Sequence, residues 1–440
     1  MTEKKRLNVI TMGCSKNLVD SERLARIMAD AGYDVCFDAD GFSGGDVVVN
    51  TCGFIGDAKE ESIEMILECV KAKADGVIGS VYVMGCLSER YRRELPESLP
   101  EVDGWYGKFD WTAIASDLAG KEHSPKSKTY ERILSDLPHR AYLKIAEGCN
   151  RFCAFCAIPL VTGRYKSRPK DEIVEEVRSL VARGVKEFNV IAQDLSYYGR
   201  DIDPEGRPLI ASLVAAISDV PGVEWIRLHY AYPADFPYDL LPVMASRPNV
   251  CKYLDIALQH ASDKVLSNMR RHIDGAATAV LLDRIRREVP GIHIRTTLMT
   301  GFPGEGDAEF EELMAFVERQ RFERMGAFAY CEEEDTFAAK NFADDIPDDV
   351  KQSRLDRLMA LQAEIAAEIN AEKVGRRMRV LVDRRDDEFF YARTEFDSPE
   401  VDGEVLIPAT ASGVKVGEFC EVEITGAAVY DLEALPVGNS

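Results

Sequence analysis

Three cysteines, Cys149, Cys153 and Cys156, stand in one short run with the spacing C-x3-C-x2-C. They come soon after an apolar, strand-like stretch at 141–146. Three thiolates from one loop are typical ligands of an iron–sulfur cluster, and a four-iron cluster would then keep one iron free to bind a substrate or cofactor. A structural zinc site would need four ligands, and the two nearby histidines lack the usual spacing for one. The pattern favours a cluster with an open iron over zinc or a disulfide loop.

A second set of cysteines is spread along the first hundred residues, and each member follows a strand-like apolar run. Cys14, Cys52 and Cys86 follow the runs 7–12, 46–50 and 80–84. Helical patterns at 19–31 and 58–72 separate these runs, and such alternation is typical of a small doubly wound parallel sheet. Since ligands of open α/β sheets gather at the carboxyl ends of the strands, we predict that these three thiols converge on a second site. Chance placement of small core residues is the competing explanation, and it is preferred for the other five cysteines, which are Cys36, Cys69, Cys251, Cys331 and Cys420.

Strand–helix alternation resumes from about residue 141 and continues to about 370, with six strand candidates, which predicts a partial (β/α)6 barrel of parallel strands. Such barrels place their sites at the carboxyl ends of the strands. Arg295 lies inside the fifth candidate strand and is equally compatible with a structural ion pair or a carboxylate clamp, whereas His260 is better explained as a hydrogen-bonded core histidine. The segment 301–306 is better explained as a turn into a helix than as a phosphate loop. The polar residues after strands two to five are Gln193-Asp194, His229-Tyr230, Gln259-His260 and Thr300-Gly301.

The last segment, from about 374 to 440, changes to short alternating stretches separated by turn residues, which predicts a small all-β barrel or sandwich. Between Asp383 and Glu433 it carries 14 acidic and four basic side chains. Small β-barrels that bind nucleic acid do so through basic, aromatic surfaces, so this one favours a basic protein as its ligand. The polar stretch 120–140 is predicted to be an interdomain linker.

The whole chain has 440 residues and a formal net charge of −22, which makes it a poor bulk binder of nucleic acid, although plain solubility explains such a charge equally well. No window approaches the roughly 18 apolar residues that span a membrane. The first ten residues lack the apolar core of a signal peptide. We therefore expect a cytoplasmic protein without membrane association, in which cysteines serve as metal ligands or core residues rather than as a disulfide framework.

The chain resembles the radical S-adenosylmethionine (radical SAM) methylthiotransferase family. The resemblance rests on GCSKNLVDSE at 13–22, TCGF at 51–54, GC at 85–86 and GCNRFCAFCAIP at 148–159, and further on SRP at 167–169, QD at 193–194, RTT at 295–297 and GFPGE at 301–305. It implies an N-terminal methylthiotransferase domain over 5–122, a radical SAM core over 135–370 and a C-terminal β-barrel of the TRAM type over 373–440.

The resemblance also implies two [4Fe–4S] clusters. One would be held by Cys149, Cys153 and Cys156 and would bind S-adenosylmethionine at its open iron. The other would be held by Cys14, Cys52 and Cys86 and would carry the sulfur to be inserted. No catalytic residue beyond these ligands is implied. Cleavage of S-adenosylmethionine would give a radical that removes hydrogen from the target carbon, and an unidentified electron donor would drive it.

Within the family, the stretches 14–22 and 397–402 resemble the branch that modifies the β-carbon of an aspartate in ribosomal protein S-twelve, a basic protein that the acidic barrel would dock. Modification of adenosine in transfer RNA is the alternative substrate class. A non-catalytic iron–sulfur carrier is the alternative outside enzymes, and it is disfavoured because carriers normally supply four cysteines per cluster. Ala257 and Cys331 depart from the family pattern, where proline and serine are usual, and neither touches the six cysteines.

Overall fold

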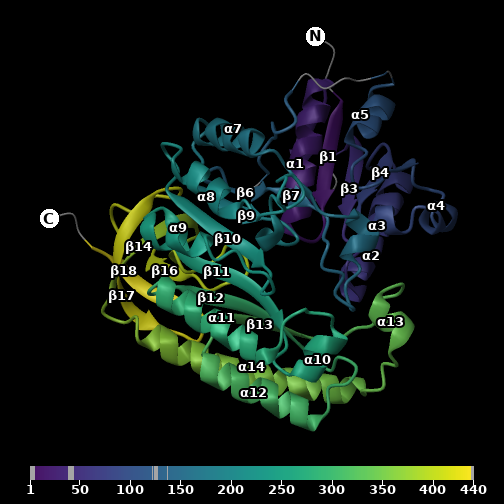
Figure 1. The fold of residues 1–440 in the computed structure, drawn as a ribbon. Helices are drawn as coiled ribbons and strands as arrows, with labels where there is room; N and C mark the ends of the chain where they lie inside the picture. The colour runs from purple at the N-terminus through teal and green to yellow at the C-terminus, as the bar shows by residue number, and fades with distance from the viewer. Residues whose placement is uncertain (1–4, 38–43, 121, 123–126, 136, 438–440) are drawn as a thin grey trace. The chain divides into compact units, whose positions relative to one another are not determined.

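The structure is a computed structural model that describes residues 5–37, 44–120, 122, 127–135 and 137–437. The chain divides into two compact units (Figure 1). The first contains Met1–Asp136, Tyr142–Asn150 and Cys156–Ser179, and the second contains Leu137–Ala141, Arg151–Phe155 and Leu180–Ser440.

The first unit contains a five-stranded parallel sheet with the order β2-β1-β3-β4-β5. Side chains on successive strand residues point to opposite faces, so Val48 packs with α1 and α5 while Val47 and Val49 pack with α2. Helices on both faces make the sheet doubly wound, as predicted. The elements are β1 (Arg6–Thr11), α1 (Ser15–Asp30), β2 (Asp34–Phe37), β3 (Asp46–Thr51), α2 (Gly56–Ala74), β4 (Val81–Gly85), α3 (Cys86–Arg90), α4 (Glu94–Ser98), β5 (Gly104–Trp105) and α5 (Trp111–Ala119).

A small two-stranded antiparallel sheet and the two ends of the cysteine run, with Cys149 and Cys156, complete the first unit. The sheet pairs β7 with β8, with Ala146 opposite Ser167 and Glu147 opposite Lys166. The elements of this part of the chain are β6 (Arg140–Lys144), β7 (Ala146–Glu147), α6 (Ile158–Thr162), β8 (Lys166–Ser167) and α7 (Lys170–Val181), of which β6 begins and α7 ends in the second unit.

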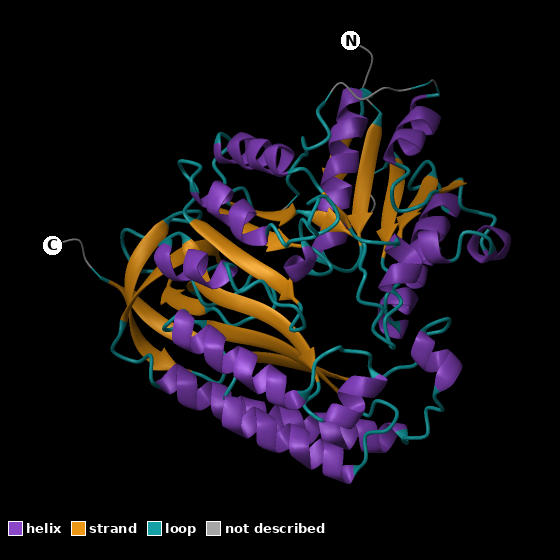
Figure 2. Ribbon diagram, in the orientation of Figure 1, coloured by secondary structure: helices purple, strands orange, loops and turns teal. Residues whose placement is uncertain are grey.

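The second unit is built on a parallel sheet with the order β13-β12-β11-β10-β9-β6 (Figure 2). The predicted partial barrel is therefore an open six-stranded sheet with crossover helices. The predicted turn at 301–306 leads into α12, as expected. Its elements are β9 (Glu187–Ile191), η1 (Leu195–Tyr197), α8 (Ile210–Ser218), β10 (Trp225–Ala231), α9 (Leu240–Ser246), β11 (Val250–Gln259), α10 (Asp263–Asn268), α11 (Gly275–Glu288), β12 (His293–Thr300), α12 (Asp307–Gln320), β13 (Arg324–Ala329), α13 (Phe337–Asn341) and α14 (Asp348–Ala371).

A closed five-stranded barrel with the order β14-β15-β16-β18-β17 ends the chain and belongs to the second unit. Alternate residues such as Val380 and Val382 fill its interior. Trp225 and Tyr253, near the starts of their strands, pack against Leu381 and Phe419 of the barrel. The barrel therefore covers the amino ends of the parallel strands, opposite their carboxyl ends. Its strands are β14 (Arg377–Arg385), β15 (Phe389–Thr394), β16 (Val405–Pro408), β17 (Phe419–Ala427) and β18 (Leu432–Pro436).

The segment predicted as a linker, 120–140, lies partly outside the described residues. Within the described stretch 127–135, Arg132 is 2 % exposed, pairs with Glu22 and donates to Glu176 at 2.8 Å. This stretch is therefore packed into the first unit, and the boundary between the two units, at Asp136 and Leu137, falls within the predicted interdomain linker. The polar composition that suggested a linker also supplies a buried ion pair.

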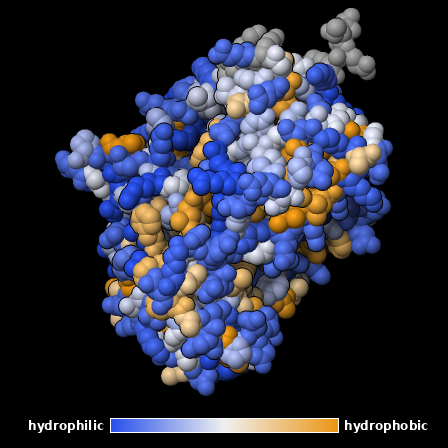
Figure 3. All heavy atoms as spheres, turned by 90° about the vertical axis from the view of Figure 1, so that its right-hand side faces the viewer, coloured by the Kyte–Doolittle hydropathy of each residue, from blue (hydrophilic) through white to orange (hydrophobic). Residues whose placement is uncertain are grey.

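Hydrophilic residues cover much of the face shown in Figure 3, with hydrophobic ones scattered between them. Among the described residues, no helix combines the length and the apolar character needed to cross a membrane.

Candidate functional site

Three cysteines of the first unit, Cys14, Cys52 and Cys86, lie at the carboxyl ends of three neighbouring parallel strands. Cys14 precedes α1 just beyond β1, Cys52 directly follows β3, and Cys86 is the first residue of α3 directly after β4. The strands β1, β3 and β4 are adjacent in the sheet. Cysteines far apart in sequence are therefore brought to one edge of the sheet, as predicted.

Glycines allow the backbones around these cysteines to approach closely. A Cβ at Gly13 would lie 2.8 Å from Cys52 Sγ, and one at Gly53 would lie 2.7 Å from the backbone nitrogen of Leu87, next to Cys86. Gly13 also has φ of 88°, which side chains other than glycine rarely adopt. A larger residue at either position would push the thiols apart.

A buried lysine, Lys108, lies among these thiols and was not singled out by any sequence pattern. Its Nζ is 3.5 Å from Cys86 Sγ, and its side chain is 2 % exposed. Asp20 and Glu147 approach the same ammonium group at 3.4 and 3.7 Å. Desolvation opposes its charge, but these carboxylates outweigh it and raise the pKa of Lys108 well above the ordinary value. A permanent positive charge therefore stands beside the cysteines and favours anionic sulfur there.

The three thiols differ in how readily they ionise. Desolvation works against ionisation of Cys14, but the charges of Lys16 and Lys108 and backbone N–H groups outweigh it, and the pKa of Cys14 is lowered. Burial raises the pKa of Cys52, and it raises that of Cys86 to about 11. Metal binding must therefore displace protons most of all from Cys52 and Cys86, whose pKa values are raised, as is usual for thiolate ligands.

The donor set of this corner fits an iron–sulfur cluster. Three thiols without a fourth ligand fall short of a closed structural zinc site. All eleven cysteines are free thiols. Among the residues that the structure describes, no three His, Cys, Asp or Glu side chains lie close enough to share a single metal ion. A four-iron cluster does not require that closeness, because each thiolate binds a separate iron.

The loop that carries the other three cysteines runs through both units. Cys149 and Cys156 belong to the first unit and Cys153 to the second. In the first unit, the N–H of Cys149 donates to the carbonyl of Gly163 at 3.2 Å, and Gly148 has φ of 80° with the backbone of Arg164 packed against its Cα. The segment after α6 therefore holds the start of the cysteine loop in place.

In the second unit, Cys153 is enclosed by an arginine and a tyrosine from other segments. Arg271 Nη1 lies 3.2 Å from Cys153 Sγ, and the Tyr232 hydroxyl lies 3.7 Å from it. That hydroxyl donates to the carbonyl oxygen of Arg271 at 2.8 Å. The guanidinium groups of Arg271 and Arg151 lie 4.1 and 4.2 Å from the centre of the Tyr232 ring. A positive charge thus stands beside this thiol too.

Sequence reasoning missed both Arg271 and Tyr232. Tyr232 lies just past the predicted pair His229-Tyr230, so following the chain beyond the strand end could have found it. Arg271 follows α10 and carries no local signal. Of the predicted residues, Asp194 does reach this region, since its carboxylate accepts from Arg151 Nε at 2.6 Å.

Non-glycine residues with positive φ gather in the same part of the second unit. Phe152 precedes Cys153, Tyr230 lies near the end of β10, Gln259 ends β11, and Arg270 precedes Arg271; their φ angles lie between 50° and 74°. Such strained positions are maintained only where surrounding structure enforces them, and they cluster at functional sites.

The remaining predicted residues have structural roles in this unit. His260 is fully buried, with Nε2 3.1 Å from Glu305 and Nδ1 accepting from the N–H of Ser262, so the expectation of a core histidine is confirmed. His229 pairs with Asn189 at 3.2 Å. The Thr300 hydroxyl donates to the carbonyl of Lys351.

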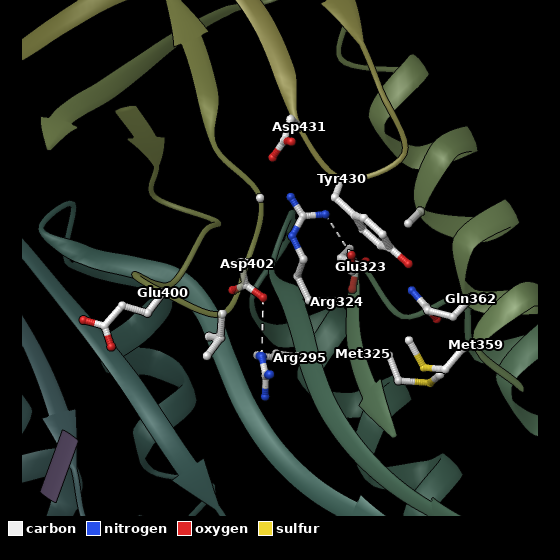
Figure 4. Close-up of a pocket in the computed structure, with 13 residues that line it drawn as sticks. Arg295, Glu323, Arg324, Met325, Met359, Gln362, Glu400, Asp402, Tyr430 and Asp431 are labelled. Carbon is white, nitrogen blue, oxygen red and sulfur yellow. Dashed lines mark hydrogen bonds and ion pairs between the residues drawn. The ribbon is translucent and has the colours of Figure 1, made fainter. Parts of the chain in front are cut away.

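Arg295 lies in a pocket of about 400 Å³ between β12, β13, α14 and loops of the barrel (Figure 4). It pairs with Asp402 at 3.4 Å and Asp255 at 3.6 Å. Because Asp402 belongs to the barrel that covers the amino ends of the strands, Arg295 forms a structural ion pair, and of the two expectations this one is confirmed.

Comparison with known proteins identifies all three segments. The chain matches the family models described as "Uncharacterized protein family UPF0004" over residues 6–107, "Radical SAM superfamily" over 143–317 and "TRAM domain" over 374–437. Proteins named "Ribosomal protein uS12 methylthiotransferase RimO" match nearly end to end. That of Porphyromonas gingivalis is 57 % identical over 98 % of this chain and 99 % of its own length, and that of Cytophaga hutchinsonii is 45 % identical over 98 % and 97 %.

Solved structures share the fold at low sequence identity. The radical S-adenosylmethionine methyltransferase TsrM from Kitasatospora setae, with cobalamin and a [4Fe–4S] cluster bound, has a TM-score of 0.55 at 14 % identity and covers 77 % of each chain. OxsB, a cobalamin-dependent S-adenosylmethionine radical enzyme, has a TM-score of 0.53 at 12 % identity and covers 83 % of this chain and 56 % of its own.

These matches support one iron–sulfur cluster together with S-adenosylmethionine, and an enzyme rather than an electron carrier. Four observations point to the same family. They are the cysteines at the strand ends, the radical SAM sheet, the closed barrel and the identity over nearly the full length. The chain therefore belongs to the radical SAM methylthiotransferases, in the family named ribosomal protein uS12 methylthiotransferase RimO.

Proposed function

We propose that this protein adds a methylthio group to the β-carbon of an aspartate in ribosomal protein uS12. The observation that carries the proposal is 57 % identity, over 98 % of the chain, to a protein named ribosomal protein uS12 methylthiotransferase. In this proposal the reaction is shared by three domains, over residues 5–122, 135–370 and 373–440. We further propose that the protein acts in the cytoplasm, where free thiols remain reduced.

Six cysteines are proposed as the metal ligands. Cys149, Cys153 and Cys156 would hold a [4Fe–4S] cluster with S-adenosylmethionine at its open iron, and Cys14, Cys52 and Cys86 would hold a second one. When bound, these groups supply the radical that removes hydrogen from an unactivated carbon and the sulfur that joins it, for which protein side chains alone have no chemistry. An external electron donor is required.

The protein's own residues tune the two sites by charge. Arg271 donates to Cys153 Sγ, and the Tyr232 hydroxyl donates to the Arg271 carbonyl, so Tyr232 holds Arg271 in position beside this cysteine. Lys108 holds a positive charge beside Cys86, where anionic sulfur would bind. Both are positioning residues.

The identity of the substrate is tested by incubating the reconstituted enzyme with purified uS12 or with transfer RNA. The mass of the protein or of the RNA is then measured by mass spectrometry. We expect one methylthio group to be added to uS12, on a peptide that contains an aspartate. We expect the transfer RNA to remain unmodified. A product on RNA alone would overturn the assignment to the ribosomal-protein branch.

The barrel is proposed to dock the basic substrate through an acidic surface. Some of its acidic residues are neutralised internally, as in the ion pair of Asp397 with Arg324. Glu421, Glu423 and Glu433 are exposed on the adjacent strands β17 and β18, and Glu423 has only a long, exposed ion pair with Arg377 at 4.0 Å. Because the barrel covers the amino ends of the parallel strands, and Cys153 contacts Tyr232 just beyond the carboxyl end of β10, docking at the barrel affects binding rather than chemistry.

Changing Glu421, Glu423 and Glu433 together to glutamine should raise the KM for uS12 severalfold and leave kcat nearly unchanged, because steering by complementary charge is lost. The KM of the parent should rise with salt, and that of the variant should rise less. The matched control changes the exposed residues Glu312, Glu318 and Glu364 of α12 and α14 to glutamine. An equal KM increase in this control would contradict docking at the barrel.

A further inference from the structure

The first unit has a pocket of about 630 Å³ with a basic lining, in a chain whose net charge is −22. It lies between α1, the start of α5, β7, β8 and the start of α7, and it contains none of the six cysteines. Its charged lining residues are Arg23, Lys144, Arg164, Lys166, Arg168, Glu147 and Glu172.

Two of the basic residues are already neutralised by the protein. Lys144 pairs with Asp20 and, at 2.8 Å, with Glu147. Arg168 pairs with Glu172 at 2.9 Å and with Glu176 at 2.7 Å. These pairs explain their burial without any ligand.

Within the part of the chain that the structure describes, Arg23 forms no such ion pair, and its guanidinium lies 5.9 Å from the centre of the Trp111 ring. It is 9 % exposed, and its Nε and Nη2 atoms are buried without a hydrogen-bond partner among the described residues. Burial and the nearby charge of Arg168 lower its pKa, and Glu176 and Asp20 only partly compensate. Buried N–H groups without hydrogen-bond partners destabilise a fold, so the unpaired Nε and Nη2 of Arg23 are best explained by an anionic ligand at this side chain.

Aromatic rings line the same pocket. Phe109 is 45 % exposed although it is a large apolar residue, and it meets Trp111 edge to face at 6.2 Å. An exposed ring next to cationic groups is the combination that binds a base and its phosphate. The volume also lies in the range of small-molecule sites.

We propose that this pocket binds a nucleotide 5′-phosphate, either free or as part of an RNA strand, with Arg23 on the phosphate and Phe109 against the base. Arg23 can donate two parallel hydrogen bonds to phosphate oxygens. An acidic peptide would satisfy Arg23 but would leave the exposed ring without a partner. The proposal is independent of the clusters and of the methylthio transfer.

Titration calorimetry on the full reconstituted protein tests the pocket, with uridine monophosphate as the probe. Saturating S-adenosylmethionine keeps the probe out of the position where that cofactor binds. We expect saturable binding that weakens at least about tenfold in Arg23→Met, because a charge-assisted pair is lost. The matched control, Arg26→Met, lies three residues further along α1 in an ion pair with Asp30 and should bind as the parent does.

A second variant covers the case in which Arg23→Met fails to fold. Phe109→Ala, at an exposed position, should weaken uridine monophosphate binding and leave inorganic phosphate binding unchanged. A uridine oligonucleotide that binds more tightly than the monophosphate would indicate RNA as the source, and equal affinity would indicate a free nucleotide. Absence of uridine monophosphate binding, binding unchanged in both variants, or tighter binding of an aspartate-rich peptide would overturn the proposal.

Discussion

Replacement of Cys153 by alanine is expected to abolish the production of 5′-deoxyadenosine from S-adenosylmethionine, by at least about 100-fold. Even loss of a residue that only orients a metal ligand typically costs 10- to 100-fold, and Cys153 is proposed as a ligand itself. Its thiol is buried against Arg271 and Tyr232, so no other cysteine of the second unit can take its place without moving them. The measurement is anaerobic turnover with dithionite, followed by chromatography of the nucleoside product.

Cys331→Ala is the control for this experiment, because Cys331 is an exposed cysteine of the same unit. Its deoxyadenosine production should equal that of the parent. If Cys153→Ala retained full production, the radical mechanism at this loop would be wrong, whatever the identity of the substrate.

Changing Cys14, Cys52 and Cys86 together to alanine should separate the two halves of the reaction. Iron content is expected to fall from about eight to about four per chain, because each cluster has four irons. Production of deoxyadenosine should persist, while uS12 should no longer gain a methylthio group. Iron analysis, deoxyadenosine assay and mass spectrometry on one preparation measure all three.

The matched control removes three cysteines that the sites do not use, Cys36, Cys331 and Cys420, which are half-buried or exposed. Eight irons and full methylthiolation should remain in that variant. Four irons in the parent, with no loss on changing Cys14, Cys52 and Cys86, would remove the second cluster.

Most regular elements were predictable because their sequence signals are local. The run around Val47–Val49 is apolar at every position since parallel strands are buried on both faces, and its helix neighbours are amphipathic. The cysteines were placed by the same logic, because each follows directly on such a run.

The strands β2, β5, β8 and β18 were not predicted, and β7 was not separated from the predicted run 141–146. The strands β2 and β5 are edge strands of two to four residues, and none of their residues is fully buried, so they lack a hydrophobic pattern. In β18 only Leu432 and Ala434 face the barrel interior. Pairing with neighbouring strands, rather than their own composition, makes these segments strands.

Buried ion pairs, like the short edge strands, could not be predicted from local sequence. Arg132 lies in a polar stretch that resembles a linker, but it is buried in the first unit because it forms ion pairs with Glu22 and Glu176. No window around Arg132 contains either partner. The burial of an arginine depends on the carboxylates that the fold brings to it, and those come from α1 and α7.

The sequence by itself determined where this protein places its six candidate thiols, since cysteine type, cysteine spacing and strand ends are local properties. The tertiary structure decided the charges around those thiols. Three basic residues come from segments that are remote in sequence from the groups they face. They are Lys108 beside Cys86, Arg271 beside Cys153 and Arg23 in its basic pocket. Electrostatic interactions act through space between groups that folding brings together, so their partners become known only when the chain is folded.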